Sequence, residues 1–483
     1  MGLVFIPVYI KFLGIEAYGL MGIFAMLQAW LVLLDLGMRP TLSREMARYT
    51  AGVHNAQSIR DLLRSVEVIA ITTAALIALL ISLASSWLAT QWLTAATIPT
   101  PVLSKALNLI GIVLGFRFVE SVYASTIVGL QRQVVDNAIS VSMATLRGLG
   151  AIGVLAYISP TVEAFFVWQV VVSLFTVALY VIVAYRSLPS APQKARFSLR
   201  AITNIGRFAT GMTFIAFLSL LLTQMDKILL SRMLTLNAFS YYALAATIAN
   251  SLYLLVAPVT TAFYPRFTEL ATTDNDDGLR FAYHQASQIV TVVMGGAAVI
   301  LTLFADPILY LWSGDRLLSD QSAVLLTILA LGTFFHALMW IPYQVQLAYG
   351  WTSLIVRTNI AAVLILVPAV LWFVPKYGAI AAACIWMTLN CGYLIFVVFF
   401  MHQKIMPTEK WRWYRNDLAT PSAVAFAVGA TCRWLVPHGL GKFTEFMALL
   451  ASGACVVAAG AMVAPAVRQI VLSHLRIKAK RLA

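Results

Sequence analysis

The chain has 483 residues, of which 61% are hydrophobic and 11% charged, and its mean hydropathy is +0.86. A soluble globular domain carries about 25% charged residues, so this composition excludes a soluble globular protein. It predicts an all-α polytopic membrane protein. The formal net charge of +14 does not indicate a nucleic-acid partner, because the positive side chains gather at the ends of apolar runs.

Apolar runs of about 20 residues recur along the chain and predict about fourteen transmembrane helices, the first of them short. Six spans form an N-terminal lobe over residues 1–200, and six form a C-terminal lobe over residues 201–404. Two extra helices and a basic cytoplasmic tail occupy residues 405–483. The expected spans are 1–10, 17–36, 66–89, 107–129, 138–158, 164–184, 208–230, 238–263, 286–311, 324–348, 354–374, 379–400, 419–436 and 444–466.

The loop charges predict the orientation, because Lys and Arg are enriched in cytoplasmic loops. With the N-terminus in the cytoplasm, the C-terminus lies there too, and most Lys and Arg side chains outside the spans fall on the cytoplasmic side. The loop cations on the other side are Lys11, Lys105, Arg232, Arg316, Lys376 and Lys442.

The two halves of the chain resemble each other. KFLGIEAYGLMGIFAMLQAWLVLL at 11–34 aligns with RMLTLNAFSYYALAATIANSLYLL at 232–255, and further weak matches keep a similar offset. Six spans per half is an even number, so both halves point the same way. This predicts a pseudo-two-fold axis along the membrane normal, with a cavity between two lobes.

The second span ends in the stretch LDLGMRPTLSREMARYTAG, residues 34–52. Arg44 and Arg48 are four residues apart on an expected short helix, so they share a face. They either anchor the cytoplasmic end of the span among anionic headgroups or line a cytoplasmic entrance that attracts an anionic substrate. Arg266, in FYPRF, occupies the equivalent place in the second half.

Arg117 and Arg147 lie deep inside two spans that run in opposite directions, so both are expected near the bilayer midplane. An arginine there costs at least about 2.5–3.5 kcal/mol and usually faces a cavity. Its planar guanidinium bonds phosphate oxygens bidentately and keeps its charge. For Arg117 the alternative is an ion pair with Glu120 on the same helix face, whereas Arg147 has no acid within four residues.

The string QMDK places Asp226 and Lys227 near the outer end of the seventh span. A buried acid in a transporter often binds a coupling cation or proton, so Asp226 is a candidate for that role. The alternative is a snorkelling Lys227 paired with Asp226.

Three other features favour packing over chemistry. GLGAIG at 148–153 matches a dinucleotide-binding pattern but lies inside an apolar span, where small residues allow helices to approach closely. His336 lies mid-span and is interpreted as a hydrogen-bonded core histidine, with a proton relay as the alternative. The four cysteines lie in or beside apolar spans and predict neither a disulfide nor a metal site.

Several strings together resemble the polysaccharide-export flippases, which translocate O-antigen and other lipid-linked oligosaccharides and are related to the MATE drug exporters and the lipid II flippases. The resemblance covers the chain to about residue 400. Members usually carry a longer first span, so the chain either begins within that span or has a short first helix. The strings are PVYIKFLGIEAYGL (7–20), LDLGMRPTLSREMARYTAG (34–52), GLQRQ (129–133), LLTQMDKILLSRML (221–234) and APVTTAFYPRFTEL (257–270).

The resemblance implies a V-shaped, alternating-access transporter of two six-helix bundles in the bacterial inner membrane. Its substrate would be an undecaprenyl-diphosphate-linked oligosaccharide, an O-antigen or exopolysaccharide unit, with Arg117 and Arg147 on the diphosphate. No cofactor is expected beyond coupling to a proton or sodium gradient. The expected partners are membrane lipids, a polysaccharide polymerase and a priming glycosyltransferase.

Two other functions stay open. A small-molecule exporter of the same fold would require acids in the cavity for cationic drugs, whereas the midplane charges here are arginines. A membrane glycosyltransferase or polymerase would require a sizeable outer loop with acids, and the longest expected outer loop, 90–106, has no Asp or Glu. We therefore expect a transporter and not an enzyme.

Overall fold

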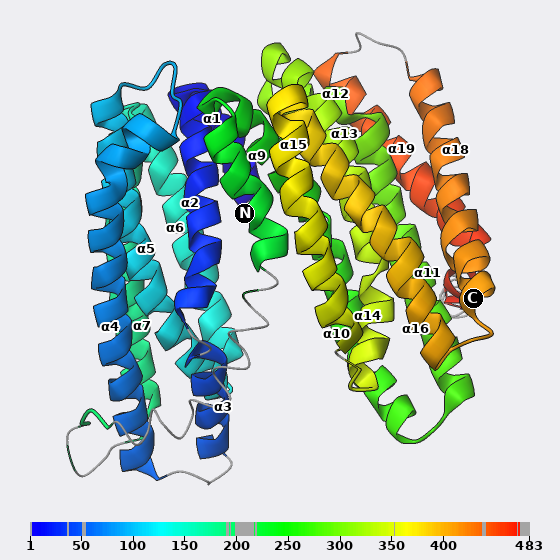
Figure 1. The fold of residues 1–483 in the computed structure, drawn as a ribbon, viewed down its shortest axis with the longest axis horizontal. Helices are drawn as coiled ribbons and strands as arrows, with labels where there is room; N and C mark the ends of the chain where they lie inside the picture. The colour runs from blue at the N-terminus through cyan, green and yellow to red at the C-terminus, as the bar shows by residue number, and fades with distance from the viewer. Residues whose placement is uncertain are drawn as a thin grey trace, which may run out of the picture. The chain divides into compact units, whose positions relative to one another are not determined.

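The computed structural model describes residues 2–35, 38–50, 55–189, 193, 195–198, 217, 220–351, 353–436, 441–470 and 472–473. These residues are helical apart from turns, loops and one isolated bridge between Thr94 and Thr235. The chain divides into two compact units, Met1–Ser240 and Tyr241–Ala483 (Figure 1). Their boundary falls within one helix, and each unit is described by itself.

Unit 1 is a bundle built around one central helix. That helix, α5, contacts five other helices of the unit and has more buried residues than any of them. Residues 220–233 are also helical. The helices are α1 (Gly2–Leu13), α2 (Ile15–Leu34), α3 (Met38–Thr50), α4 (Ala56–Trp87) with a π-helical turn at Leu88–Trp92, α5 (Thr100–Gly129), α6 (Gln133–Tyr157), α7 (Val162–Ser187) and α9 (Leu236–Ser251), which continues into unit 2.

Local sequence explains where these helices begin and how closely they pack. The Asn55 side chain accepts the Ser58 backbone N–H at 2.7 Å at the start of α4, and Thr161 caps α7 in the same way. Gly115 in α5 leaves room for the Ala74 carbonyl of α4, and Gly129 leaves room for the backbone of α3 at Ser43. A Cβ at either glycine would push these helices apart.

Unit 2 contains the remaining helices. Gly378, with φ 63° and ψ −150°, separates two helices within α15 near the expected break between 374 and 379. The bounds are α10 (Tyr253–Thr272), α11 (Asp276–Leu303), α12 (Ala305–Ser313), α13 (Arg316–Leu338), α14 (Trp340–Ala348), α15 (Ser353–Gly392), a π-helical turn at Tyr393–Val397, α16 (Val398–Ile405), α17 (Lys410–Arg412), a π-helical turn at Trp413–Ala419, α18 (Thr420–Leu435) and α19 (Lys442–Val463).

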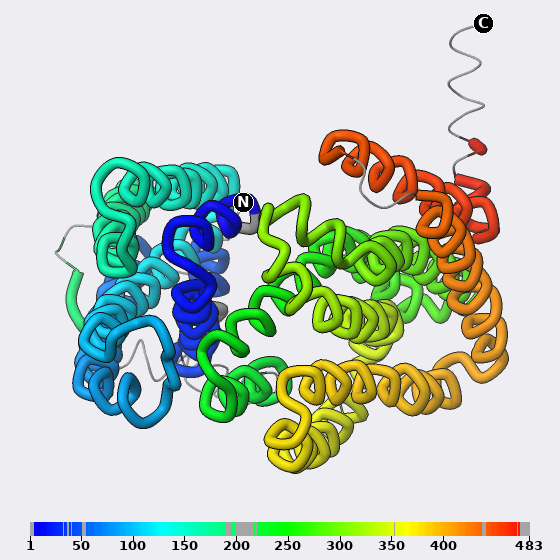
Figure 2. Tube along the Cα trace, turned by 90° about the horizontal axis from the view of Figure 1, so that it is seen from above, coloured from blue at the N-terminus to red at the C-terminus, as the bar shows by residue number. Residues whose placement is uncertain are grey.

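The core of unit 2 lies where α10, α11, α13 and α14 meet the segment from Leu394 to Trp413. The two C-terminal helices α18 and α19 pack against each other and against α11, as Figure 2 shows from above. Gly429 of α18 faces Val299 and Leu303 of α11, so the small residue allows this close contact.

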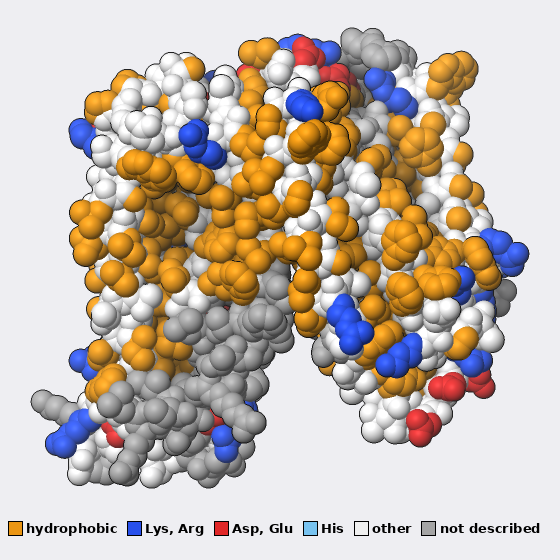
Figure 3. All heavy atoms as spheres, viewed as in Figure 1, with side chains coloured by type: hydrophobic (Ala, Val, Ile, Leu, Met, Phe, Trp, Pro, Cys, Tyr) orange, Lys and Arg blue, Asp and Glu red, His pale blue; other side chains and the backbone are white. Residues whose placement is uncertain are grey.

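The predicted all-α polytopic membrane fold is confirmed. Nine helical segments of the described chain are long and apolar enough to cross a bilayer. Each expected span coincides with a helix or a pair of helices, although the span at 208–230 is described only from residue 220. On the face drawn in Figure 3, hydrophobic side chains cover the middle of the helices, and most charged side chains lie toward the helix ends.

The predicted domain boundaries and the predicted basic tail stay predictions. The lobe boundaries at 200/201 and 404/405 were drawn from span counts, whereas the compact units divide at Ser240 and Tyr241. The basic tail beyond residue 473 lies outside the described residues. The four cysteines, Cys384, Cys391, Cys432 and Cys455, are free in the structure.

Candidate functional site

Arg117 lies in the middle of α5, the central helix of unit 1. Its Nη1 atom is 3.3 Å from Glu120 Oε1, and the two side chains are 18% and 17% exposed. The local ion pair weighed from the sequence is therefore present. The pair leaves the Nε–H of Arg117 buried without an acceptor among the described residues. Arg117 thus has a charge partner but spare hydrogen-bonding capacity.

Arg147 lies on α6, a helix that contacts both α1 and α5. Its side chain is half-buried, and its Nε and Nη2 atoms are inaccessible to solvent and have no hydrogen-bond acceptor in the described part of the chain. Its guanidinium interacts electrostatically with Arg117, Glu120 and Tyr9. The structure therefore brings the two mid-span arginines into one polar cluster.

The backbone around Arg147 is held by two aromatic side chains. The Tyr9 hydroxyl of α1 donates to the Gly148 carbonyl at 3.2 Å, and Trp168 Nε1 of α7 donates to the Arg147 carbonyl at 3.3 Å. Gly148 packs against Phe5, and Gly150 packs against Trp168. The string GLGAIG thus lies inside a helix, and two of its glycines, Gly148 and Gly150, allow the close helix packing that the sequence predicted.

The arginine cluster (Tyr9, Arg117, Glu120 and Arg147) has one more cation than anion. Buried guanidinium groups normally find acceptors, because an unpaired charged donor in an apolar environment is costly. The arrangement can therefore bind a small anion, and phosphate or diphosphate oxygens match guanidinium geometry well. Tyr9 and Trp168 were not picked out from the sequence, and no local pattern marks them.

Arg44 and Arg48 are both exposed on α3. Arg48 pairs with buried Glu45 at 3.1 Å, so one face of α3 carries an ion pair and a second cation. The helix is anchored at its start by Asp35, whose carboxylate accepts the Arg39 backbone N–H at 3.1 Å.

Arg266 lies on α10 in unit 2, where its Nη1 atom is 2.9 Å from Glu269 Oε2 and both side chains are mostly exposed. Arg266 follows an apolar segment and is exposed, as Arg44 and Arg48 are. This similarity agrees with the equivalent positions that the two halves of the sequence give them. An exposed ion pair of this kind contributes at most about 1 kcal/mol to stability.

Asp226 and Lys227 are half-buried in the helical segment 220–233. The Lys227 ammonium donates to Gln224 Oε1 at 3.1 Å. Four residues after Lys227, the Ser231 hydroxyl accepts a hydrogen bond from Trp92 Nε1 at 3.2 Å. Asp226 thus lies next to a segment that is fixed by contacts with the end of the α4 segment.

His336 of α13 is a hydrogen-bonded core histidine, the simpler of its two interpretations. Its Nδ1 atom lies 2.7 Å from the Tyr253 hydroxyl, and its ring packs edge-on to Tyr253 and Trp340.

Two buried acids of unit 1 were not predicted to matter. Glu67 of α4 accepts hydrogen bonds from the Tyr123 hydroxyl at 2.6 Å and the Tyr185 hydroxyl at 2.7 Å, and it pairs with Arg64 at 2.8 Å. Glu16 of α2 accepts backbone N–H groups of the loop that precedes α5. The sequence feature that could have pointed to Glu67 and Glu16 is an acidic residue next to an apolar run.

Two family profiles match the sequence. The family described as Polysaccharide biosynthesis protein matches residues 1–271, and MatE matches residues 211–372. A curated protein of Shigella flexneri, named "Putative O-antigen transporter", is 21% identical over 379 residues, and the match covers 77% of this chain and 87% of that protein.

Two solved structures share the fold. Lipid II flippase MurJ in an inward closed conformation gives a TM-score of 0.71 at 14% identity, covering 95% of this chain and 96% of that chain. An inward-facing multidrug resistance MATE family transporter of the MOP superfamily gives a TM-score of 0.63 at 15% identity, covering 85% and 94%. At such low identity the likeness shows the fold alone.

Proposed function

The chain belongs to the polysaccharide biosynthesis protein family, and on that premise we propose that it flips a lipid-linked oligosaccharide across the membrane. The observation that carries the proposal is Arg147, whose buried Nε and Nη2 atoms lack an acceptor among the described residues. A diphosphate group supplies such acceptors. The relative named as an O-antigen transporter and the structural neighbour named as a lipid II flippase support this substrate class.

In its finer form, the proposal names an undecaprenyl-diphosphate-linked oligosaccharide, such as an O-antigen or exopolysaccharide unit. Alternating access moves it from the cytoplasmic to the outer leaflet of the bacterial inner membrane, with both termini of the protein in the cytoplasm. Arg117 and Arg147 bind the diphosphate. The excess of loop Lys and Arg on the expected cytoplasmic side supports the orientation. We also propose a polysaccharide polymerase and a priming glycosyltransferase as protein partners, which the family resemblance implies.

The MatE match supports a second candidate, a small-molecule exporter of the same fold. An exporter of cationic drugs needs acids in its binding cavity. The arginine cluster instead has one more cation than anion, which favours an anionic substrate. A membrane enzyme is the least favoured function, because the family profiles and the named relatives describe biosynthesis and transport proteins.

The sidedness of the lipid-linked oligosaccharide tests the function. We expect substrate to accumulate in the cytoplasmic leaflet when the gene is deleted and to reach the outer leaflet when it is restored. Enzymatic labelling of intact and opened vesicles measures both pools. Unchanged sidedness in a deletion strain without a second translocase would favour the exporter.

We also propose Asp226 as the coupling site. In the same vesicles, Asp226→Asn should change how the flipping rate depends on a proton or sodium gradient. An unchanged dependence would exclude Asp226 as the coupling site.

We further propose that Arg44, Arg48 and Arg266 line the cytoplasmic entrance. Raising the ionic strength from about 0.01 M to about 0.15 M shortens the Debye length from about 30 Å to about 8 Å, so attraction by exposed charges weakens. We expect the wild-type flipping rate to fall up to about tenfold over this range. The double variant Arg44→Gln/Arg48→Gln should be slower at low salt and nearly insensitive to salt. Lys105→Gln, on the opposite side, is the control, and equal salt responses in all three proteins would refute the role.

A further inference from the structure

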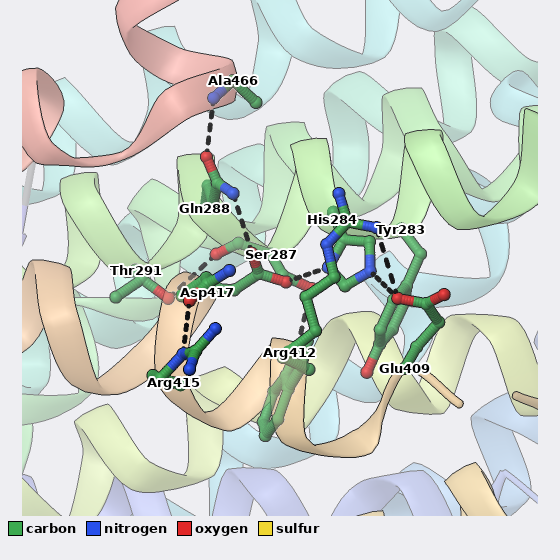
Figure 4. A network of polar contacts seen from close by, with 12 residues as sticks. Tyr283, His284, Ser287, Gln288, Thr291, Glu409, Arg412, Arg415, Asp417 and Ala466 are labelled. Carbon is green, nitrogen blue, oxygen red and sulfur yellow. Dashed lines mark hydrogen bonds and ion pairs between the residues drawn. The ribbon is translucent and has the colours of Figure 1, made fainter. Parts of the chain in front are cut away.

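A second polar cluster lies in unit 2, where the start of α11 meets the segment after α16 (Figure 4). His284 of α11, only 6% exposed, has a carboxylate at each ring nitrogen. Its Nε2 atom is 2.8 Å from Glu409 Oε2, and its Nδ1 atom contacts Asp417 Oδ2. Gln288, one turn further along α11, donates from Nε2 to Asp417 Oδ1 at 2.7 Å. We call His284, Gln288, Glu409 and Asp417 the histidine clamp.

The clamp joins three separate segments. Glu409 and Asp417 belong to the link between α16 and α18, and Gln288 Oε1 accepts the Ala466 backbone N–H at 2.8 Å just beyond α19. The same link is anchored by Trp413, which is 1% exposed and donates from Nε1 to Ser287 Oγ at 3.0 Å. Both ends of the C-terminal helix pair, α18 and α19, are thus fastened to one turn of α11.

Hydrogen-bond stoichiometry determines how many protons the clamp holds. A neutral imidazole has one N–H donor and one acceptor nitrogen, whereas an ionised carboxylate only accepts. A neutral His284 between two ionised carboxylates would therefore lose one of its two contacts. The observed geometry requires one additional proton, carried either on His284 as imidazolium or on Asp417 and shared with His284 Nδ1. The two assignments differ only in the place of the proton within one coupled pair.

The surroundings indicate which carboxylate stays ionised. Burial raises the pKa of Asp417, although bonds from His284 and Gln288 oppose the rise. At Glu409 burial also acts upward, but His284 together with Arg412 and Arg280 holds the pKa below its ordinary value. The extra proton thus belongs to the His284–Asp417 contact, and Glu409 remains an anion.

Other titratable side chains surround the clamp, and each has a partner of its own. Arg412 Nη1 is 3.4 Å from Glu409, which balances the second carboxylate. Beside His284, the Tyr283 hydroxyl lies 3.2 Å from His402 Nε2, and His402 Nδ1 donates to the Val398 carbonyl at 2.9 Å. A neutral His402 with its proton on Nδ1 satisfies both contacts. Lys410 interacts with His402, and Tyr414 with Tyr283, at longer range.

We propose that the histidine clamp is a proton-binding site that fastens the α16–α18 link and the α18–α19 pair to α11 and releases the link when it loses its proton. Deprotonation leaves His284 with a single N–H, so either Glu409, which is 7% exposed, or Asp417, which is 1% exposed, faces a ring nitrogen that no longer donates. A buried carboxylate that loses its bond from His284 weakens the attachment of the link to α11. On the predicted orientation the clamp faces the cytoplasm, so its docking responds to cytoplasmic pH. This inference does not depend on the transported substrate.

Hydrogen exchange of the full-length protein in lipid nanodiscs tests the clamp directly. Backbone amides of residues 409–419 should be protected at about pH 5.5 and should exchange about tenfold faster at about pH 8.5, after correction for intrinsic rates. Amides of α5 in unit 1 provide the internal reference. Equal protection of 409–419 at both pH values in the wild type would overturn the proposal without bearing on transport.

Two substitutions should remove the pH response in opposite directions. Asp417→Asn keeps an acceptor for Gln288 and presents an NH₂ group to a neutral His284, so the link should stay protected at both pH values. His284→Gln cannot donate to both carboxylates, so the link should exchange quickly at both. The matched control is His402→Asn, which should titrate like the wild type. A wild-type pH response in Asp417→Asn would also overturn the proposal.

Discussion

Arg147→Ala is expected to abolish most flipping, lowering the rate about a hundredfold, while the protein still folds and inserts. A bidentate bond between guanidinium and phosphate involves two charge-assisted hydrogen bonds, each worth about 1.5–3 kcal/mol, and about 3 kcal/mol corresponds to a factor of about one hundred. Folding should tolerate the change, because Arg147 Nε and Nη2 bond nothing in the described part of the chain. The outer-leaflet pool of labelled oligosaccharide in vesicles measures the rate.

Graded variants separate charge from geometry. Arg147→Lys keeps the charge but loses the planar fork, so we expect a smaller loss of about tenfold. Arg117→Ala should also impair flipping, and it should lower stability as well because it leaves the half-buried Glu120 without its ion pair. Arg132→Ala is the control, since this exposed arginine contacts Ser187 and lies outside the cluster. Wild-type rates for Arg147→Lys would refute bidentate binding.

Glu16→Ala is expected to lower the free energy of unfolding of unit 1 by about 3 kcal/mol or more. Glu16 is 4% exposed and accepts three consecutive backbone N–H groups, from Ala96 at 2.5 Å, Thr97 at 2.8 Å and Ile98 at 3.0 Å. It also accepts the Thr97 hydroxyl. Each buried donor left without an acceptor costs about 1–3 kcal/mol. The loop between the end of the α4 segment and α5 should therefore lose its fixed conformation.

The midpoint of thermal unfolding in detergent micelles measures this loss. The control is Glu163→Ala, because Glu163 pairs with Lys105 at 3.3 Å in a contact where the side chains are 38% and 67% exposed. Such a surface pair contributes about 0–1 kcal/mol, so its loss should barely move the midpoint. Similar midpoints for both variants would show that the three backbone contacts of Glu16 do not stabilise unit 1.

The sequence allowed much of the fold to be predicted, because hydropathy and helix punctuation act locally. The expected spans 354–374 and 379–400 leave a break between them, and the structure places the non-helical Gly378 there. The ion pair of Arg117 with Glu120 followed from the i,i+3 spacing alone. Likewise, glycines inside an apolar run predicted close helix packing, which Gly148 and Gly150 show.

Contacts between segments that lie far apart in the chain could not be predicted from the sequence. Glu16 meets the 96–98 loop about eighty residues away, and His284 meets Glu409 and Asp417 more than a hundred residues away. No periodicity relates such positions, because they meet only when separate helices pack.

The sequence by itself thus determined an all-helical membrane protein, the positions of its spans and the placing of two arginines within them. Only the tertiary structure decided which polar groups of distant segments meet. Residues three or four apart on a helix share a face whatever surrounds them, so Arg117 finds Glu120 locally. Whether Arg147, His284 or Glu16 meets an acceptor, a carboxylate or a loop depends on how neighbouring helices approach, and small residues such as Gly148 and Gly429 set that approach.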